Sequence, residues 1–329
     1  MQTNTAASAV SAARVFSKVL LVIFTVEVAV MFVLPLILPR TLPAEVRAIV
    51  DAALLTATAA PLLWWIVIEP IIKEQEVRRQ AELRLAQTQA KLQLAAEIQK
   101  KLLPKSEPVL PGTDIAARLT PAECTSGDFY DFPSMSDGSI GIVIADVSGH
   151  GIDSALLVAS ASAYLRALTR SSHDVGDILT RLNEFLVEQS QEGRFITLFL
   201  GKIDPSTMSL SYAAAGHRAY HFDTTETVSM LEAASPPLGL VPGVTIPSAD
   251  PISLRPGETL LWVTDGIEES ASPEQELFGS TRVIQLIQSH QRLSSQKTLD
   301  LLYREAREFA SGEPQLDDMT AIILKVLDT

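Results

Sequence analysis

The stretch S-I-G-I-V-I-A-D-V-S-G-H-G, residues 139–151, decides how the second part of the chain folds. Its first nine residues, Ser139–Val147, are rich in β-branched side chains, which is typical of a buried strand. A turn containing glycine follows, and residues 151–170 have the composition and periodicity of a helix. Asp146 therefore stands where a buried strand emerges into a loop.

Similar apolar runs predict further strands at 194–204, 207–215, 258–264 and 319–327. Helical periodicity predicts helices at 175–191, 280–291 and 294–311. Asp204-Pro205-Ser206 is typical of a hairpin turn between the first two of these strands. Two successive helices followed by successive strands argue against a regular β-α-β alternation. We therefore predict an α+β fold built on antiparallel sheets.

Three further acidic motifs lie at or near strand ends. They are SGDFYD with Asp128 and Asp131, TDGIEES with Asp265, and LDDMT with Asp317 and Asp318. An Asp-Gly pair alone more often marks a turn than a ligand. Several carboxylates that emerge from strand ends can nevertheless converge on one cavity, as hard oxygen ligands for Mg²⁺ or Mn²⁺.

The motifs occur in a recognisable order between Ala96 and Leu327. They read EIQKKLLP, PAECTSGDFYD, IADVSGHGIDSALL, AAAGHRAY, PPLGL, LWVTDGIEE, LFGSTR and LDDMTAIIL. This ordered set resembles the PPM-type metal-dependent serine/threonine protein phosphatases, in the bacterial branch named for SpoIIE and RsbU. The resemblance implies a PPM-phosphatase-like α-β-β-α sandwich over residues 112–329, with two antiparallel sheets flanked by helices. Ser126 stands where the family usually has glycine, and we expect this to relax the turn only slightly.

The resemblance also implies a centre with two Mn²⁺ or Mg²⁺ ions. The expected ligands are Asp146, the Val147 backbone carbonyl, Asp265, Asp317, Asp128 and Asp318. Asp146 would bridge the ions, while Asp317 and its neighbour Asp318 cannot be separated as ligands. Asp128, Asp146, Asp265 and Asp317 are the expected catalytic residues, through two-metal activation of a water molecule that attacks the phosphoryl group.

Other polar residues in the motifs have alternative interpretations. His150 would act as a general acid or make a structural hydrogen bond, whereas we interpret His217 as structural. Arg118 is a further candidate for a phosphate contact, although an arginine on a strand face is usually solvated. Cys124 is not expected to be a nucleophile, because the Cys-x5-Arg cradle of cysteine phosphatases would need arginine where Tyr130 stands.

Two apolar runs near the N-terminus, residues 19–38 and 48–72, are each long enough to span a bilayer. Basic residues in the tail, 1–18, and after the second run predict that both ends of this helical hairpin face the cytoplasm. A cleaved signal peptide is the alternative for the first run, but no small-residue cleavage site follows it. We therefore expect a two-span protein of the cytoplasmic membrane with a cytoplasmic catalytic domain.

Residues 73–104 connect the two parts and are predicted to form one long linker helix, because they lack glycine and are rich in helix-forming residues. Pro104, Pro108 and Pro111 end it. A heptad-like seam runs through Ala81, Leu85, Leu92, Ala95 and Leu102. The seam favours a coiled coil in a parallel homodimer, and the alternative is a single helix that packs on its own domain.

Composition limits the function further. A net charge of −13 argues against nucleic-acid binding, and a single cysteine excludes an intramolecular disulfide. The expected function is a membrane-anchored phosphatase acting on a phosphoserine or phosphothreonine protein, and the resemblance implies an anti-sigma-factor antagonist as that substrate. The alternatives are a catalytically silent partner-binding module of the same fold and, less favoured with only two spans, a membrane receptor or transporter.

Overall fold

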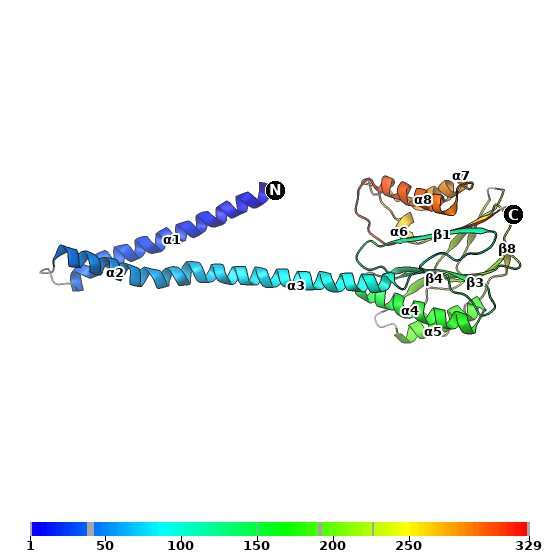
Figure 1. Cartoon of the computed structure of the whole chain (residues 1–329), viewed down its shortest axis with the longest axis horizontal. Helices are drawn as coiled ribbons and strands as arrows, with labels where there is room; N and C mark the ends of the chain where they lie inside the picture. The colour runs from blue at the N-terminus through cyan, green and yellow to red at the C-terminus, as the bar shows by residue number, and fades with distance from the viewer. Residues whose placement is uncertain (1, 38–42, 150, 190–192, 226, 328–329) are drawn as a thin grey trace. The chain divides into compact units, whose positions relative to one another are not determined.

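A computed structural model describes residues 2–37, 43–149, 151–189, 193–225 and 227–327 (Figure 1). The chain divides into two compact units, Met1–Gln89 and Ala90–Thr329. The first unit contains the helices α1 (Gln2–Ile37) and α2 (Ala44–Leu63), the short π-helix η1 (Trp64–Ile68) and most of α3 (Glu69–Lys100).

The contact between α1 and α2 is an apolar stripe. Val22, Val26, Val30 and Leu34 recur every four residues on α1 and are buried in one cluster with Ala59 of α2, as expected for neighbours on one helix face. Much of the remaining apolar surface is exposed, as at Phe24 and Phe32. Two helices, Val15–Ile37 and the continuous helix Ala44–Lys100, are long and apolar enough to cross a bilayer by length and composition.

The second unit is a sandwich of two five-stranded antiparallel sheets, with the strand orders β1-β10-β9-β6-β7 and β2-β3-β4-β5-β8. The first sheet consists of β1 (Thr113–Thr120), β10 (Met319–Val326), β9 (Thr259–Val263), β6 (Ala219–Phe222) and β7 (Val228–Leu231). The second consists of β2 (Asp128–Asp131), β3 (Ile140–Val147), β4 (Ile196–Asp204), β5 (Ser209–Ala215) and β8 (Ile252–Ser253).

Helices cover the outer face of each sheet (Figure 1). The helices α4 (Ile152–Ser171) and α5 (Val175–Gln189) pack on the second sheet, and α7 (Gly279–Ser289) and α8 (Ser295–Ala310) pack on the first. Side chains of both sheets form the core between them, among them Phe199, Trp262 and Ile322. The predicted α+β fold and its α-β-β-α layering are therefore confirmed.

The strands and helices predicted between residues 139 and 327 agree with the structure within two residues at each end, and the hairpin at Asp204 joins β4 to β5 as predicted. Toward the N-terminus, the helix expected at 19–38 is part of the longer α1, and the helices expected at 48–72 and 73–104 form one continuous helix, Ala44–Lys100. The sequence analysis did not predict β1, β2, β6, β7 and β8 or the one-turn helix α6 (Asp265–Glu268). Most of these elements have only two to four residues, which is too short for a periodic pattern to be recognised.

The C-terminal end of α3 is hydrogen-bonded to the sandwich, within the second unit. Gln99 accepts a hydrogen bond from the backbone N–H of Ser126 (2.9 Å) and donates one to the Ser126 carbonyl (2.5 Å). Arg166 of α4 donates to the carbonyl of Leu102 (2.8 Å) and forms a two-pronged ion pair with the buried Asp131 (2.6 and 3.0 Å). The end of the long helix thus holds the segment that leads into β2.

Candidate metal centre

Two of the predicted ligands face each other across neighbouring strands. Asp128 on β2 is paired directly with Asp146 on β3 in the antiparallel register. Asp128 is 2% exposed, and its Oδ2 accepts hydrogen bonds from the hydroxyls of Thr264 (2.7 Å) and Thr320 (2.5 Å). Burial and the charge of Asp146 raise its pKa well above the ordinary value. Like charges directly opposite each other destabilise a sheet, so this pair favours a shared proton or a cation.

Asp146 lies among several other carboxylates. Burial first, and then the charges of Asp265, Asp317 and Asp318, raise its pKa to about 7. Asp146 lies in β3 of the second sheet, whereas Asp265, Asp317 and Asp318 lie next to β9 and β10 of the first. The carboxylates that the sequence analysis selected therefore lie close enough to repel one another in the folded chain.

Asp265 and Asp317 are brought together by adjacent strands. Asp265 follows β9 and Asp317 precedes β10, and these strands are antiparallel neighbours. A side chain on Gly266 would meet the Asp318 carbonyl oxygen at 2.1 Å, so only glycine permits this approach of the two loops. Removal from water and the nearby charge of Asp317 raise the pKa of Asp265, although its side chain keeps an exposed surface.

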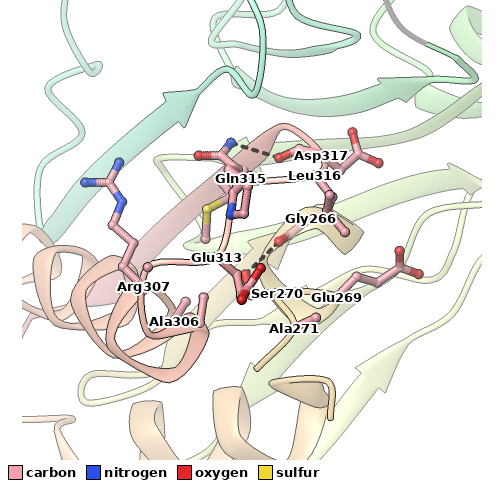
Figure 2. A pocket seen from close by; sticks show the side chains of 14 residues that line it. Gly266, Glu269, Ser270, Ala271, Ala306, Arg307, Glu313, Gln315, Leu316 and Asp317 are labelled. Carbon is pink, nitrogen blue, oxygen red and sulfur yellow. Dashed lines mark hydrogen bonds between the residues drawn. The ribbon is translucent and has the colours of Figure 1, made fainter. Parts of the chain in front are cut away.

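These carboxylates border two neighbouring cavities. Asp146 and Asp265 line a cavity of about 370 Å³, and Asp317 lines a second cavity of about 400 Å³ together with Gly266. Glu269 lines both cavities. Figure 2 shows the second cavity, in which Gln315 donates a hydrogen bond to the backbone carbonyl of Asp317 (2.8 Å).

Among the described residues, the Asp318 carboxylate accepts three hydrogen bonds, whereas the Asp317 carboxylate accepts one. Asp318 Oδ1 accepts from the Ala122 N–H (2.8 Å), and its Oδ2 accepts from the Ser126 hydroxyl (2.7 Å) and the Gly127 N–H (2.6 Å). It is 7% exposed. The Asp317 side chain is exposed, and its one hydrogen bond among the described residues comes from the Asp318 N–H (2.7 Å). The two neighbours thus differ in how free their carboxylates are to bind a cation.

Ser126 and Gly127 shape the backbone beside Asp146. A side chain on Gly127 would lie 2.9 Å from the Val147 carbonyl oxygen and 3.8 Å from Asp146 Oδ1, so the glycine keeps that carbonyl uncovered. The Ser126 hydroxyl donates to Asp318 and accepts from the Asp128 N–H (3.0 Å). The serine therefore links two of the acidic motifs, a role beyond the slight relaxation of a turn that we expected.

The donor set suits Mg²⁺ or Mn²⁺, because both ions prefer carboxylate and carbonyl oxygens. The raised pKa values of Asp128 and Asp146 indicate negative charge that a divalent cation would neutralise. Within the described ranges, however, no group of three or more His, Cys, Asp or Glu side chains has the geometry of a formed metal site. The carboxylates are neighbours that would have to turn toward a cation in order to bind it.

The remaining candidates lie in different surroundings. His150 is outside the described residues. His217 is 7% exposed, with Nδ1 3.4 Å from the Thr197 hydroxyl, and burial together with the charge of Arg218 lowers its pKa to about 4. Arg118 pairs with Asp300 and lies over the Tyr303 ring at 4.9 Å, and it is not among the residues that line either cavity.

Sequence reasoning missed the hydroxyls that hold Asp128. Thr264 and Thr320 each stand within a quoted motif, TDGIEES and LDDMT, so their positions beside the aspartates were the available signal. It also missed Arg218 and Glu268, which line the cavity with Asp146 and form an ion pair (2.6 Å). Only the folded structure places these two residues beside the carboxylates.

Without metal, the stabilising effect of Asp146→Asn is expected to grow as the pH rises from about 4 to about 7. The pKa of Asp146 is raised from 3.8 to about 7, so the folded wild type gains stability from the retained proton at low pH and loses it through this window. The free energy of unfolding of Asp146→Asn should exceed that of the wild type by up to about 2 kcal/mol, a value reduced for solvent screening. Urea unfolding in EDTA at about pH 5 and about pH 7.5 measures it.

Using the difference between the two proteins removes the contribution of His217. The lowered pKa of His217 makes stability rise with pH in both proteins, so it cancels in the comparison. A difference that stays constant across this pH range would contradict the electrostatic environment described for Asp146.

The sequence matches the family described as Stage II sporulation protein E (SpoIIE) over residues 136–327. Protein IcfG of Synechocystis sp. is 30% identical over 262 residues, which cover 70% of this chain and 40% of IcfG. The phosphoserine phosphatase RsbU of Bacillus subtilis is 28% identical over 238 residues, which cover 72% of this chain and 70% of RsbU. This chain therefore spans well under half the length of IcfG and about two thirds of RsbU.

The fold has solved counterparts as well. The SiaA-PP2C domain of Pseudomonas aeruginosa superposes with a TM-score of 0.66 at 24% identity, covering 74% of this chain and 99% of that domain. The family match spans more than half of the chain and includes the motifs of Asp146, Asp265 and Asp317. From the sequence match we conclude that this chain belongs to the SpoIIE family, and from the shared sandwich that it has the fold of a PP2C domain.

Proposed function

We propose that this chain is a metal-dependent phosphatase that hydrolyses phosphoserine or phosphothreonine in a protein substrate. The observation that supports it most is the convergence of Asp128, Asp146, Asp265 and Asp317, where burial first, and then repulsion between the carboxylates, raises three of the pKa values. The name of RsbU, a phosphoserine phosphatase, points to the same substrate class. Membership of the SpoIIE family then supports phosphate hydrolysis as the reaction at the acidic cavity.

In this proposal Asp146, Asp265, Asp317 and the Val147 carbonyl would hold the cations. Two bound Mn²⁺ or Mg²⁺ ions would supply Lewis-acid activation of a water molecule and neutralise the phosphoryl group. The chain itself holds the carboxylates in place. Thr264 and Thr320 fix Asp128, and Gly266 permits the contact between the loops of Asp265 and Asp317.

The experiment that tests the function measures Mn²⁺-dependent release of phosphate from a phosphoserine protein and from an aryl phosphate. Asp146→Asn and Asp265→Asn are the comparison variants, because both remove a proposed ligand with little change of shape. Wild-type turnover that requires metal and disappears in both variants supports the proposal. Equal rates without metal or in both variants would exclude it, and the complete absence of turnover would favour a catalytically silent partner-binding module.

Asp317→Asn and Asp318→Asn are expected to affect different properties although the residues are adjacent. The first should weaken Mn²⁺ binding and lower turnover about 100-fold at equal stability. The second should lower the free energy of unfolding by about 2 kcal/mol, because an amide cannot accept all three hydrogen bonds that reach the buried carboxylate. Calorimetric Mn²⁺ titration and urea unfolding separate the two effects, and the reverse pattern would make Asp318 the ligand.

We further propose that α1 and α2 anchor the protein in the cytoplasmic membrane and that the catalytic domain faces the cytoplasm. Two apolar helices with largely exposed apolar side chains support this. Extraction of the full chain from membranes by detergent, but not by alkaline carbonate, is the expected behaviour. Release by carbonate alone would contradict the anchor.

The linker helix is proposed to regulate the site, through a homodimer that pairs along its heptad seam. The hydrogen bonds of Gln99 to Ser126 give its end direct access to the loop that precedes Asp128. Full, regulated activity in a monomer whose linker helix has melted would contradict this. The substrate is proposed to be a phosphorylated anti-sigma-factor antagonist, and its capture by an Asp146→Asn cytoplasmic fragment would identify it.

A further inference from the structure

A positively charged side chain, that of Arg218, lies among the acidic groups of the cavity that contains Asp146 and Asp265. Arg218 is the only lysine or arginine among the described residues that line it. Its acidic lining residues are Asp146, Glu232, Asp265, Glu268 and Glu269. A phosphate dianion entering this cavity would therefore meet three glutamates at its wall, and a single guanidinium to offset them.

Arg218 is held in one direction by two neighbours. Its Nη2 donates to Glu268 Oε2 (2.6 Å), and the Tyr220 hydroxyl donates to Glu268 Oε1 (2.7 Å). The guanidinium carbon also lies 5.8 Å from the centre of the Tyr220 ring. Tyr220 is fully buried and the Glu268 side chain is 14% exposed, so both supports are part of the folded core. The orientation of the guanidinium is therefore set before any ligand arrives.

The arginine nevertheless remains available for a ligand. Its side chain is 45% exposed, and a guanidinium has five N–H donors. Glu268 and Tyr220 are its partners within the described part of the chain, which leaves donors free. A planar guanidinium matches the spacing of two oxygens on a phosphoryl group and can bind them in a two-pronged manner.

We propose that Arg218 binds the phosphoryl oxygens of the substrate in this cavity, with Glu268 and Tyr220 acting as the positioning residues. The inference deepens the proposed phosphatase function and rests on it. The phosphoryl group is the expected partner because Arg218 shares its cavity with two of the proposed metal ligands, Asp146 and Asp265. Arg118, the sequence-based candidate for this role, pairs with Asp300 outside the cavity.

The test compares Arg218→Gln and Arg218→Lys on two substrates, para-nitrophenyl phosphate and a phosphoserine protein. Arg218→Gln should lower kcat/KM by about 10- to 100-fold on both, and should weaken inhibition by inorganic phosphate by about 10-fold. Arg218→Lys keeps the charge without the planar fork and should recover part of the loss. Mn²⁺ affinity should stay unchanged in both variants, because neither removes a proposed ligand.

Two further variants serve as controls. Arg304→Gln removes an arginine of α8 whose ion pairs among the described residues are with Glu305 and Glu308 at the surface, and it should leave every parameter unchanged. Tyr220→Phe leaves the charge of Arg218 but frees one Glu268 oxygen, and it should raise KM by about 2- to 5-fold. The melting temperature of each variant shows whether it has folded.

Each contrary result has a distinct meaning. If Arg218→Gln lost activity on the phosphoprotein alone, the Arg218 contact would lie on the polypeptide beside the phosphoserine and not on the phosphoryl group. If Arg218→Gln were as active as the wild type on both substrates, any contact would be refuted. A wild type without metal-dependent turnover would refute the proposed function instead. In that case calorimetric binding of inorganic phosphate with Mn²⁺ still tests Arg218, and equal affinity in wild type and Arg218→Gln would overturn the inference.

Discussion

Replacing Asp146 by asparagine is expected to lower metal-dependent phosphate release by about 10³-fold, roughly 4 kcal/mol of transition-state stabilisation. Asp146 is the proposed bridge between two ions, so its loss affects both at once. In EDTA at neutral pH, the same variant should be at least as stable as the wild type, since it removes a charge that burial and the carboxylates of Asp265, Asp317 and Asp318 disfavour. Initial rates at saturating Mn²⁺ and urea unfolding in EDTA measure the two effects.

This combination distinguishes a ligand from a structural carboxylate. Asp177→Asn is the matched control, because the Asp177 side chain is exposed on α5 and its ion pair among the described residues is a long one with Arg181 (3.8 Å). It should change neither activity nor stability by more than about 0.5 kcal/mol. If Asp146→Asn unfolded more easily than wild type without metal, Asp146 would be a structural residue and the proposed bridge would be wrong.

Gly266→Ala is expected to damage both folding and metal binding. A β-carbon at this position would meet the Asp318 carbonyl oxygen at 2.1 Å and the Asp317 carbonyl carbon at 3.2 Å. These are backbone atoms, so relief requires the two loops to separate and to carry Asp265 away from Asp317. We expect a loss of about 3 kcal/mol in the free energy of unfolding and at least about 100-fold in turnover.

Gly138→Ala is the control for the general cost of replacing a glycine. Gly138 has φ +84° and no atom within 4 Å of an added β-carbon, so the change should cost about 1 kcal/mol through backbone strain alone. Its Mn²⁺ affinity should equal that of the wild type. Wild-type Mn²⁺ affinity in Gly266→Ala would show that the spacing of the loops does not control the site.

The sequence predicted the parts of the fold that follow long patterns, and it selected the candidate site residues that stand in ordered motifs. The strands β3, β4, β5, β9 and β10 were predictable because each is a run of at least five residues rich in β-branched or other apolar side chains. Asp146 and Asp265 could be selected because each follows or ends such a strand and is succeeded by a glycine turn. Ordered motifs then indicated the family, which the comparisons confirmed.

Other features depend on contacts between distant segments and could not be predicted in this way. Asp317 and Asp318 are chemically identical neighbours, and only the donors from Ala122, Ser126 and Gly127 distinguish them. Those donors lie nearly two hundred residues earlier in the chain. Arg218 and Glu268 each stand in a quoted motif, but the pairing between them could not be predicted, because they lie 50 residues apart in the sequence.

The position of β10 has a consequence for the timing of synthesis. This strand is the last in the chain, yet it lies between β1 and β9 and carries Thr320, which binds Asp128. A nascent chain that still holds this segment inside the ribosome can complete neither the first sheet nor the acidic cavity. The surroundings of Asp128 can therefore be complete only after translation has passed β10, whatever the earlier segments have already built.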